Sequence, residues 1–221
     1  MWFEPFAIVL ALLPLAAYLL LLGTIRLFFP PLVTSGGRDL VALAMALAGM
    51  LAVGPVELFF PGAAAALFGP AVWLAMILFY ALLVLLIVVT IQPRLIVYGA
   101  SAPEVVEPLF KAALRLDAKA QQDSRQRQVW LPTLGIRLRI DGHRHFDTSQ
   151  VVAFERDLTP QFWAELLGGL RFEMKSAPTV QRYGGAGMLF VGMLLLLLVA
   201  SVAYTHPTEV SAGFKNWLWR Q

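Results

Sequence analysis

The sequence contains, at residues 71–91, the run AVWLAMILFYALLVLLIVVTI, which holds 21 residues and no charged side chain. About 20 consecutive apolar residues in an α-helix are enough to cross the ~30 Å hydrocarbon core of a bilayer. The run therefore predicts a transmembrane helix. It is followed by the longest polar region of the chain, residues 92–183, and a second apolar run comes after that region.

The composition supports the same class. Hydrophobic residues make up 59% of the 221 residues and charged residues only 14%, whereas about 25% of the residues in an ordinary soluble domain are charged. The net charge of +3 comes from basic residues that are mixed with acids and form no dense run, so nucleic acid is not an expected partner. The absence of cysteine excludes disulfides, thiolate catalysis and cysteine metal ligands.

Three further apolar runs predict transmembrane helices at about residues 6–29, 39–60 and 184–204. The first run lacks a basic segment before it and is longer than the apolar core of a signal peptide, so we expect it to be retained. Pro14 is expected to kink this helix, and Arg26 to extend towards lipid headgroups. Pro30-Pro31 and Ser35-Gly36-Gly37 predict a turn-rich connector before the second helix.

The second predicted helix carries small residues at close spacing, which are Ala44, Ala48, Gly49 and Ala52. Small side chains let another helix approach closely, and in lipid this dispersion contact drives helix association. We therefore expect this helix to lie inside the bundle, with contacts either within one chain or between copies. Glu57, near the outer end of this helix, is a candidate intramembrane acid, with placement at the interface as the alternative.

The polar region predicts a small α+β domain with both helices on one face of the sheet and the other face wet or turned to a partner. Ser101 and Glu104 match a capping box at a helix start. Gly99-Ala-Ser101-Ala-Pro103 lacks the last glycine of a nucleophile elbow, so we expect no catalytic serine. The predicted elements are a strand at 94–98, a helix from 101 to about 120, a loop at 121–128, strands at 129–134 and 136–140, a helix from 159 and an edge strand at 171–174.

Asp141-Gly142 predicts a hairpin turn after the second of these central strands. The length of the loop decides which side chains of the following strand are buried, because a one-residue shift of register exchanges the two faces of a strand. We expect a three-residue loop ending at Gly142, since this length buries the apolar residues of that strand. That loop would place Phe146, Val152 and Phe154 on the buried face with Ile136 and Leu138.

The candidate functional face of this hairpin comprises Arg137, Arg139, His143, His145 and Asp147. The alternating His143, His145 and Asp147 resemble a set of metal ligands, but two nearby arginines would oppose a bound cation, and we expect no metal and no cofactor. A solvated face remains one interpretation. The other is a face that contacts anions, either lipid headgroups or an acidic partner.

The lysines and arginines near the predicted helix ends indicate the orientation. Arg26 and Arg38 flank the first connector, and Arg94, Lys175 and Arg182 flank the polar region. This distribution predicts a bacterial-type inner (plasma) membrane protein with residues 92–183 in the cytoplasm and both termini outside. Residues 205–221 would form a short extracytoplasmic tail, in which Trp217 and Trp219 are candidate interfacial anchors.

The resulting hypothesis is an α-helical integral membrane protein with four transmembrane helices and a small α+β domain inserted between helices 3 and 4. We expect a non-enzymatic anchoring, assembly or regulatory role, with the lipid bilayer and either a protein partner or further copies of the chain as its contacts. A small transporter or channel subunit is the alternative, although the predicted spans offer it only Thr24, Glu57, Thr90 and Ser201. A membrane-embedded enzyme is the third hypothesis and would need Arg38, Asp39, Arg94 and the hairpin face.

Overall fold

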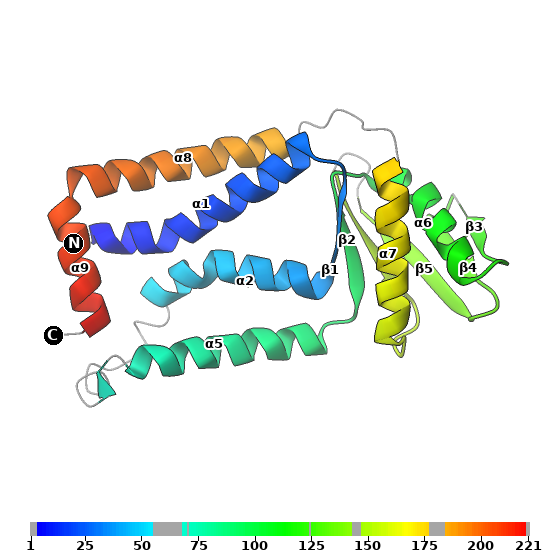
Figure 1. The fold of residues 1–221 in the computed structure, drawn as a ribbon, viewed down its shortest axis with the longest axis horizontal. Coiled ribbons are helices and arrows are strands. Elements are labelled where there is room, and N and C mark those ends of the chain that lie inside the picture. The colour runs from blue at the N-terminus through cyan, green and yellow to red at the C-terminus, as the bar shows by residue number, and fades with distance from the viewer. Residues whose placement is uncertain are drawn as a thin grey trace. The chain divides into compact units, whose positions relative to one another are not determined.

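A computed structural model of the chain describes residues 4–54, 68–69, 71–123, 125–142, 147–176 and 184–219. The chain divides into two compact units. A helical unit contains residues 1–21, 40–90 and 188–221, and an α+β unit contains residues 22–39 and 91–187. Within the described residues, the fold is mostly helical, with four long apolar helices and one six-stranded sheet (Figure 1).

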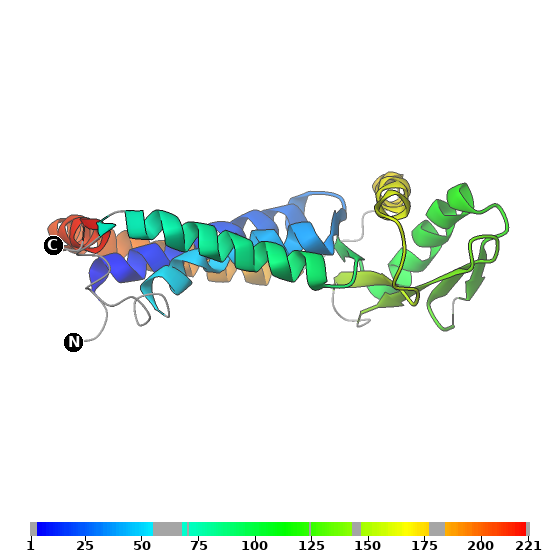
Figure 2. The ribbon, with the colours of Figure 1, turned by 90° about the horizontal axis from the view of Figure 1, so that it is seen from below.

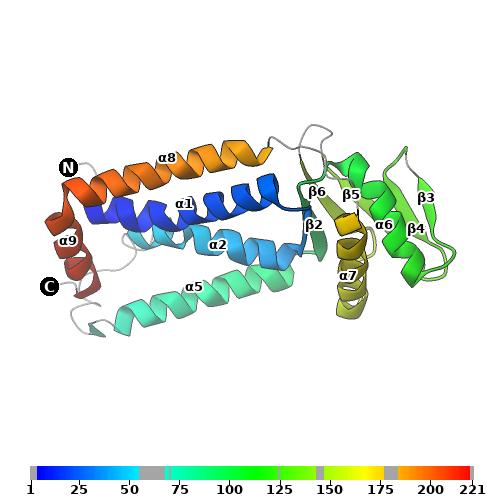
Figure 3. The same ribbon diagram turned by 45° about the horizontal axis from the view of Figure 1, so that its top comes forward.

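The four predicted apolar helices are confirmed as helices that are long and apolar enough to cross a membrane. They are α1 (Pro5–Phe28), α2 (Gly36–Val53), α5 (Ala71–Thr90) and α8 (Gly184–Thr205). Figure 3 shows them lying side by side. The predicted end of the second helix, near residue 60, and Glu57 lie outside the described residues.

Within the helical unit, α1 is the most buried of the long helices and α2 is the next. α2 contacts α1 at Gly49 and α5 at Ala44. Glycines of the neighbouring helices allow these helices to approach α1 closely. A Cβ on Gly49 of α2 would lie 2.0 Å from the Leu10 carbonyl oxygen, and one on Gly192 of α8 would lie 3.0 Å from Leu20. Glycine is needed at position 49 because the backbones of α1 and α2 meet there.

The other small residues of α2 have less demanding surroundings. Ala44, Ala48 and Ala52 are only partly buried. The carbonyl of Ala44 accepts a hydrogen bond from the Tyr80 hydroxyl of α5, at 2.7 Å. This contact joins two helices whose surfaces are otherwise almost entirely apolar.

The predicted tail forms a further helix, α9 (Pro207–Trp219). Its Gly213 lies against the Phe6 ring of α1. Trp217 packs on Trp73 of α5 with ring centroids 3.7 Å apart, and the Trp73 indole donates to the Leu218 carbonyl at 3.1 Å. Trp217 is therefore part of the packing of the helical unit, while the side chain of Trp219 lies outside the described residues.

In the α+β unit, all neighbouring strands are antiparallel and their order is β1-β2-β6-β5-β4-β3. Figure 2 shows the two helices of the unit on one face of the sheet, as predicted. The strands are β1 (Leu32–Ser35), β2 (Arg94–Tyr98), β3 (Gln121–Asp123), β4 (Gln128–Leu131), β5 (Ile136–Asp141) and β6 (Thr148–Ala153). The helices are α6 (Ala102–Leu116) and α7 (Pro160–Ser176).

The core of the unit lies between the sheet and these helices. It contains Leu95 and Val97 of β2, Leu138 of β5, Leu109 of α6 and Leu166 of α7, each almost completely buried. Along β5, buried and exposed positions alternate, as expected for a strand with one face on a core. Arg137 and Arg139 therefore project from the opposite face.

The predicted hairpin register is wrong. In the structure, Leu138 pairs with Ala153 and Ile140 pairs with Val151, so Val152 and Phe154 share the face of the arginines. The connection from Asp141 to Thr148 contains six residues instead of the expected three. A change from an odd to an even number of loop residues exchanges the buried and the exposed side chains of the second strand. Phe146, His143 and His145 lie outside the described residues.

The predicted edge strand at 171–174 is also wrong, because α7 continues through Gly168-Gly169 to Ser176. Gly169 faces Ala112 of α6, with 3.3 Å between the position of its absent Cβ and the Ala112 Cβ. The two glycines therefore do not end the helix, and Gly169 allows α6 to approach. Leu170 and Met174 continue the buried stripe of α7 into the core.

The largest addition to the expected domain is β1. The connector that was expected to be rich in turns contains a four-residue strand, which pairs with β2 from Leu32↔Tyr98 to Ser35↔Leu95. Val33 is buried in the core, and its carbonyl accepts a hydrogen bond from the Arg171 side chain of α7 at 2.9 Å. Segment 22–39 thus belongs to the same compact unit as residues 91–187.

The contact of Gly49 with α1 gives a direct test of the helix packing. We expect Gly49→Ala to lower the stability of the detergent-solubilised protein by roughly 1–3 kcal/mol, because the added methyl group forces two backbones apart. Thermal unfolding followed by tryptophan fluorescence measures this change.

Gly187→Ala in α8 is the matched control, since nothing lies within 4 Å of its absent Cβ. Alanine favours a helix by up to about 1 kcal/mol over glycine, so this variant should be as stable as the parent or more so. Equal melting temperatures for the two variants would contradict the described packing.

Candidate functional site

The sequence-predicted site residues are divided between two places in the α+β unit. Arg137 and Arg139 lie together on the exposed side of β5. Asp147 lies in the segment just before β6 and is paired with Arg26 instead. Within the described residues, no group of three His, Cys, Asp or Glu side chains is placed to hold a metal ion. His143, His145 and Glu57 are outside this description.

The two arginines belong to an exposed patch that also contains two aromatic rings. Trp130 of β4 is the register partner of Arg137, and the backbone N–H of Phe154 donates to the Arg137 carbonyl at 3.0 Å. Trp130, Arg137 and Phe154 consequently form a row across three adjacent chain segments. The next row contains Gln128, Arg139 and Val152. We call Trp130, Arg137, Arg139 and Phe154 the outer patch.

Each arginine of the outer patch lies over one of the rings. The Arg137 guanidinium carbon is 5.8 Å from the centroid of Trp130, and that of Arg139 is 5.5 Å from the centroid of Phe154. Cation–π contacts of this length at exposed sites contribute about 0.5–1 kcal/mol each. The rings stay accessible, with exposed fractions of 41% for Trp130 and 51% for Phe154.

One carboxylate is paired with the Arg139 guanidinium, and another lies at the backbone of Arg137. Arg139 forms an ion pair with Asp141 at 2.8 Å. The backbone N–H of Arg137 donates to a carboxylate oxygen of Glu155 at 2.9 Å, which brings that charge to the start of β5. The outer patch and its surroundings therefore combine aromatic rings with nearly balanced charges.

Another part of this sheet face, at β2, is covered by the residues of segment 22–39 that lie on either side of β1. The Tyr98 hydroxyl donates to Asp39 at 2.5 Å, and the Arg26 guanidinium lies 5.9 Å from the centroid of the Tyr98 ring. A Cβ on Gly36 would lie 2.7 Å from the side chain of Arg94. Ile96, which projects from this face between Arg94 and Tyr98, is only 3% exposed.

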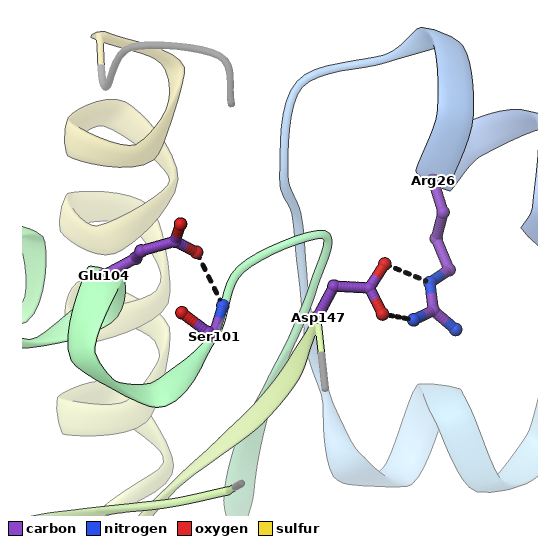
Figure 4. Close-up of polar contacts among 4 residues, drawn as sticks. All are labelled: Arg26, Ser101, Glu104 and Asp147. Atoms are coloured by element: carbon purple, nitrogen blue, oxygen red, sulfur yellow. Dashed lines mark hydrogen bonds and ion pairs between the residues drawn. The ribbon is translucent and has the colours of Figure 1, made fainter. Parts of the chain in front are cut away.

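Arg26, which is buried, and Asp147, which is partly buried, form an ion pair at the end of the sheet (Figure 4). The guanidinium donates from Nε to one carboxylate oxygen at 3.3 Å and from Nη2 to the other. The carbonyl of Asp147 also accepts a hydrogen bond from the Gly99 N–H at 2.7 Å. The expectation that Arg26 extends to lipid headgroups is wrong, because its side chain is buried and paired within the α+β unit.

Ser101 has the position that its sequence context predicts. It precedes the first residue of α6, and its N–H donates to the Glu104 carboxylate at 2.7 Å, which is the reach-back contact of a capping box (Figure 4). The requirements of the helix start therefore account for both residues.

We expect Arg26→Met and Asp147→Asn each to destabilise the protein by about 3–5 kcal/mol, because either change removes the opposite charge from a largely buried ionic group. The double variant should lose less than the sum of the two single changes. Thermal unfolding of the full chain in detergent provides all four values of the cycle.

Lys111→Met is the control for this cycle. Lys111 pairs with Glu107 on the exposed side of α6, and such pairs contribute little. If Arg26→Met shifted the melting temperature no more than Lys111→Met, the Arg26–Asp147 contact would not stabilise the fold.

The side chains described at the outer patch and at the Arg26–Asp147 pair can make non-covalent contacts. The outer patch offers stacking surfaces and guanidinium donors to a second molecule. The Arg26–Asp147 pair instead joins two distant segments of the α+β unit. No family model, curated protein or solved structure matches this chain.

Proposed function

We propose that the chain is a multi-pass membrane protein whose four long apolar helices cross the bilayer. The observation that carries this proposal is the surface of α5 and α8, where large apolar side chains are exposed over most of the helix circumference. Exposed surfaces of this kind on soluble proteins are confined to small patches. On α5 they include Leu74, Ile77, Phe79, Leu82, Leu86 and Val89, and on α8 Phe190, Met193, Leu194 and Leu197.

The proposed orientation is the one in which residues 92–183 lie in the cytoplasm of a bacterial-type inner membrane. It rests on the basic residues that flank this region and the first connector, since positive charges near helix ends are retained on the cytoplasmic side. Both termini, and with them α9, would then lie outside. In this orientation Lys215 of α9 is a basic residue on the outer side, but more basic residues lie near the helix ends on the cytoplasmic side.

The proposed role is anchoring, assembly or regulation through contacts of the α+β unit. This role is supported by the composition of the outer patch, because Trp, Phe and Arg are the residues enriched where proteins contact one another. The contrast between the covered and the exposed parts of this sheet face also supports the proposed role. Segment 22–39 packs on the β1–β2 side, while the β4–β5 side keeps two aromatic rings exposed.

Single-cysteine labelling tests the proposed insertion and orientation, because the natural chain contains no cysteine. Lys111→Cys places a thiol on α6, and Lys215→Cys places one on α9, both at exposed positions. We expect a membrane-impermeant maleimide to label the Lys215→Cys variant in intact spheroplasts. The Lys111→Cys variant should react only after permeabilisation.

The reverse labelling pattern would contradict the orientation. Release of the parent protein from membranes by an alkaline carbonate wash would contradict the insertion itself. The two claims therefore fail on separate measurements.

Purification of the tagged full chain in mild detergent tests the role. We expect a polypeptide, either another protein or a second copy of this chain, to remain bound in a constant ratio, as light scattering and quantitative mass spectrometry of the eluate would show. A chain that purifies alone as a monomer and moves a solute across reconstituted vesicles would contradict the role and favour the transporter.

A further inference from the structure

Arg94, the first residue of β2, has a guanidinium group without an acceptor among the described residues. Its Nε atom is buried and makes no hydrogen bond there. By contrast, Arg26, Arg127 and Arg171 each donate to a carboxylate or a carbonyl of the same unit. Buried polar groups in proteins are almost always hydrogen-bonded, and an exception calls for an explanation such as a bound ion. Arg94 therefore needs an acceptor that the described residues do not supply.

The first turn of α2 lies over the side chain of Arg94. A Cβ on Gly36 would be 2.7 Å from Cγ of Arg94 and 3.1 Å from its Nε. Position 36 therefore has no room for a side chain while Arg94 keeps its place. Arg38 follows in the same turn of α2 and is exposed. Two positive charges thus lie close together where β1 is followed by α2, and both belong to the α+β unit.

The acid in the same turn of α2, Asp39, is held by a different residue. Its carboxylate accepts a hydrogen bond from the Tyr98 hydroxyl at 2.5 Å, and Tyr98 is at the opposite end of β2 from Arg94. Neither Arg38 nor Arg94 forms an ion pair with a described residue. The two arginines therefore form a positive site to which the described part of the chain contributes no anion.

The chemistry of the guanidinium and the place of the site in the chain indicate which anion it takes. Guanidinium groups bind phosphate oxygens through two parallel N–H···O hydrogen bonds. α2 begins at Gly36, and α5 ends at Thr90, shortly before Arg94. If both helices cross the bilayer, the two arginines lie at their cytoplasmic ends, where basic residues meet anionic lipid headgroups.

We propose that Arg38 and Arg94 bind the phosphate group of an anionic phospholipid, with Arg94 Nε as the buried donor. This inference rests on the proposed function, because the lipid comes from the bilayer that α2 and α5 cross. It goes beyond the general attraction of basic residues for headgroups, since it assigns one site and one donor atom. It also assigns a role to Gly36, which leaves room for the Arg94 side chain.

The first experiment measures the dissociation constants of two lipids for the detergent-solubilised full chain by native mass spectrometry. Phosphatidylglycerol has a phosphate and a net negative charge, whereas phosphatidylcholine has the same phosphate but no net charge. We expect the parent to bind phosphatidylglycerol more tightly. Arg38→Met and Arg94→Met should each weaken that binding by about tenfold or more, as expected for the loss of a hydrogen bond between charged groups.

Arg137→Met is the matched control. It removes the same charge from another arginine of the α+β unit, on the exposed side of β5. This variant should keep the affinity of the parent for phosphatidylglycerol. If Arg137→Met weakened binding as much as Arg94→Met, or if the parent bound both lipids equally, the attraction would depend on overall charge and the proposal would be overturned.

Thermal unfolding of the delipidated protein tests whether Arg94 has only a structural role. Arg94→Met removes a buried donor without an acceptor and keeps an aliphatic stem, so it should unfold at no lower temperature than the parent. Added phosphatidylglycerol should then raise the melting temperature of the parent and not that of the variant. A lower melting temperature of the delipidated variant would show that Arg94 is paired within the chain and overturn the proposal.

Two further comparisons test the donor and the source of the phosphate. Arg94→Lys keeps the charge but lacks Nε, and we expect it to bind phosphatidylglycerol more weakly than the parent does. Full binding by this variant would overturn the assignment of the donor atom. Inorganic phosphate should not displace the lipid. Displacement at the same concentration as for the lipid itself would identify a site for soluble phosphate and overturn the lipid as ligand.

The alkaline carbonate wash separates this inference from the proposed function. A chain that remains in washed membranes but does not distinguish the two lipids would overturn the lipid site and leave the insertion intact. A chain that the wash releases would contradict the insertion, and with it the bilayer as the source of the ligand.

Discussion

The pairing of β1 with β2 is the contact on which the α+β unit depends. It adds residues 32–35 to a sheet whose other strands begin at residue 94, and thereby makes the ends of α1 and α2 part of the same compact unit. The Arg26–Asp147 pair and the Tyr98–Asp39 hydrogen bond follow from this pairing. They hold the chain on either side of β1 against the sheet and cover the β1–β2 part of its outer face.

This covering explains why the outer patch is limited to the β4–β5 side of the sheet. An antiparallel sheet with helices on one face has a second face that is free to meet water or a partner. Here the chain uses part of that face for its own segment 22–39 and leaves exposed the part with Trp130 and Phe154. The free edge of β1 is protected as well, because Arg171 binds the Val33 carbonyl.

The sequence was sufficient for features set by local patterns. Uninterrupted apolar runs predicted the four long helices, the Ser101–Glu104 spacing predicted the start of α6, and the alternation along β5 predicted that Arg137 and Arg139 are exposed. Features set by distant contacts were missed. β1 is only four residues long and lies between Pro30-Pro31 and Gly36-Gly37, so its turn signals obscured it. The β5–β6 register depended on a loop longer than the Asp141-Gly142 signal implied, and Arg26 and Asp147 are 121 residues apart.

The most direct measurement of the central claim is hydrogen–deuterium exchange of the full chain in a membrane mimetic, with peptides that separate residues 32–35 from residues 94–98. If β1 is part of the sheet, those of its backbone N–H groups that face β2 should exchange as slowly as the N–H groups of β2, because both are released by opening of the same unit. Exchange of all β1 amides within seconds, while β2 remains protected, would show that segment 22–39 is only a connector and would contradict the account.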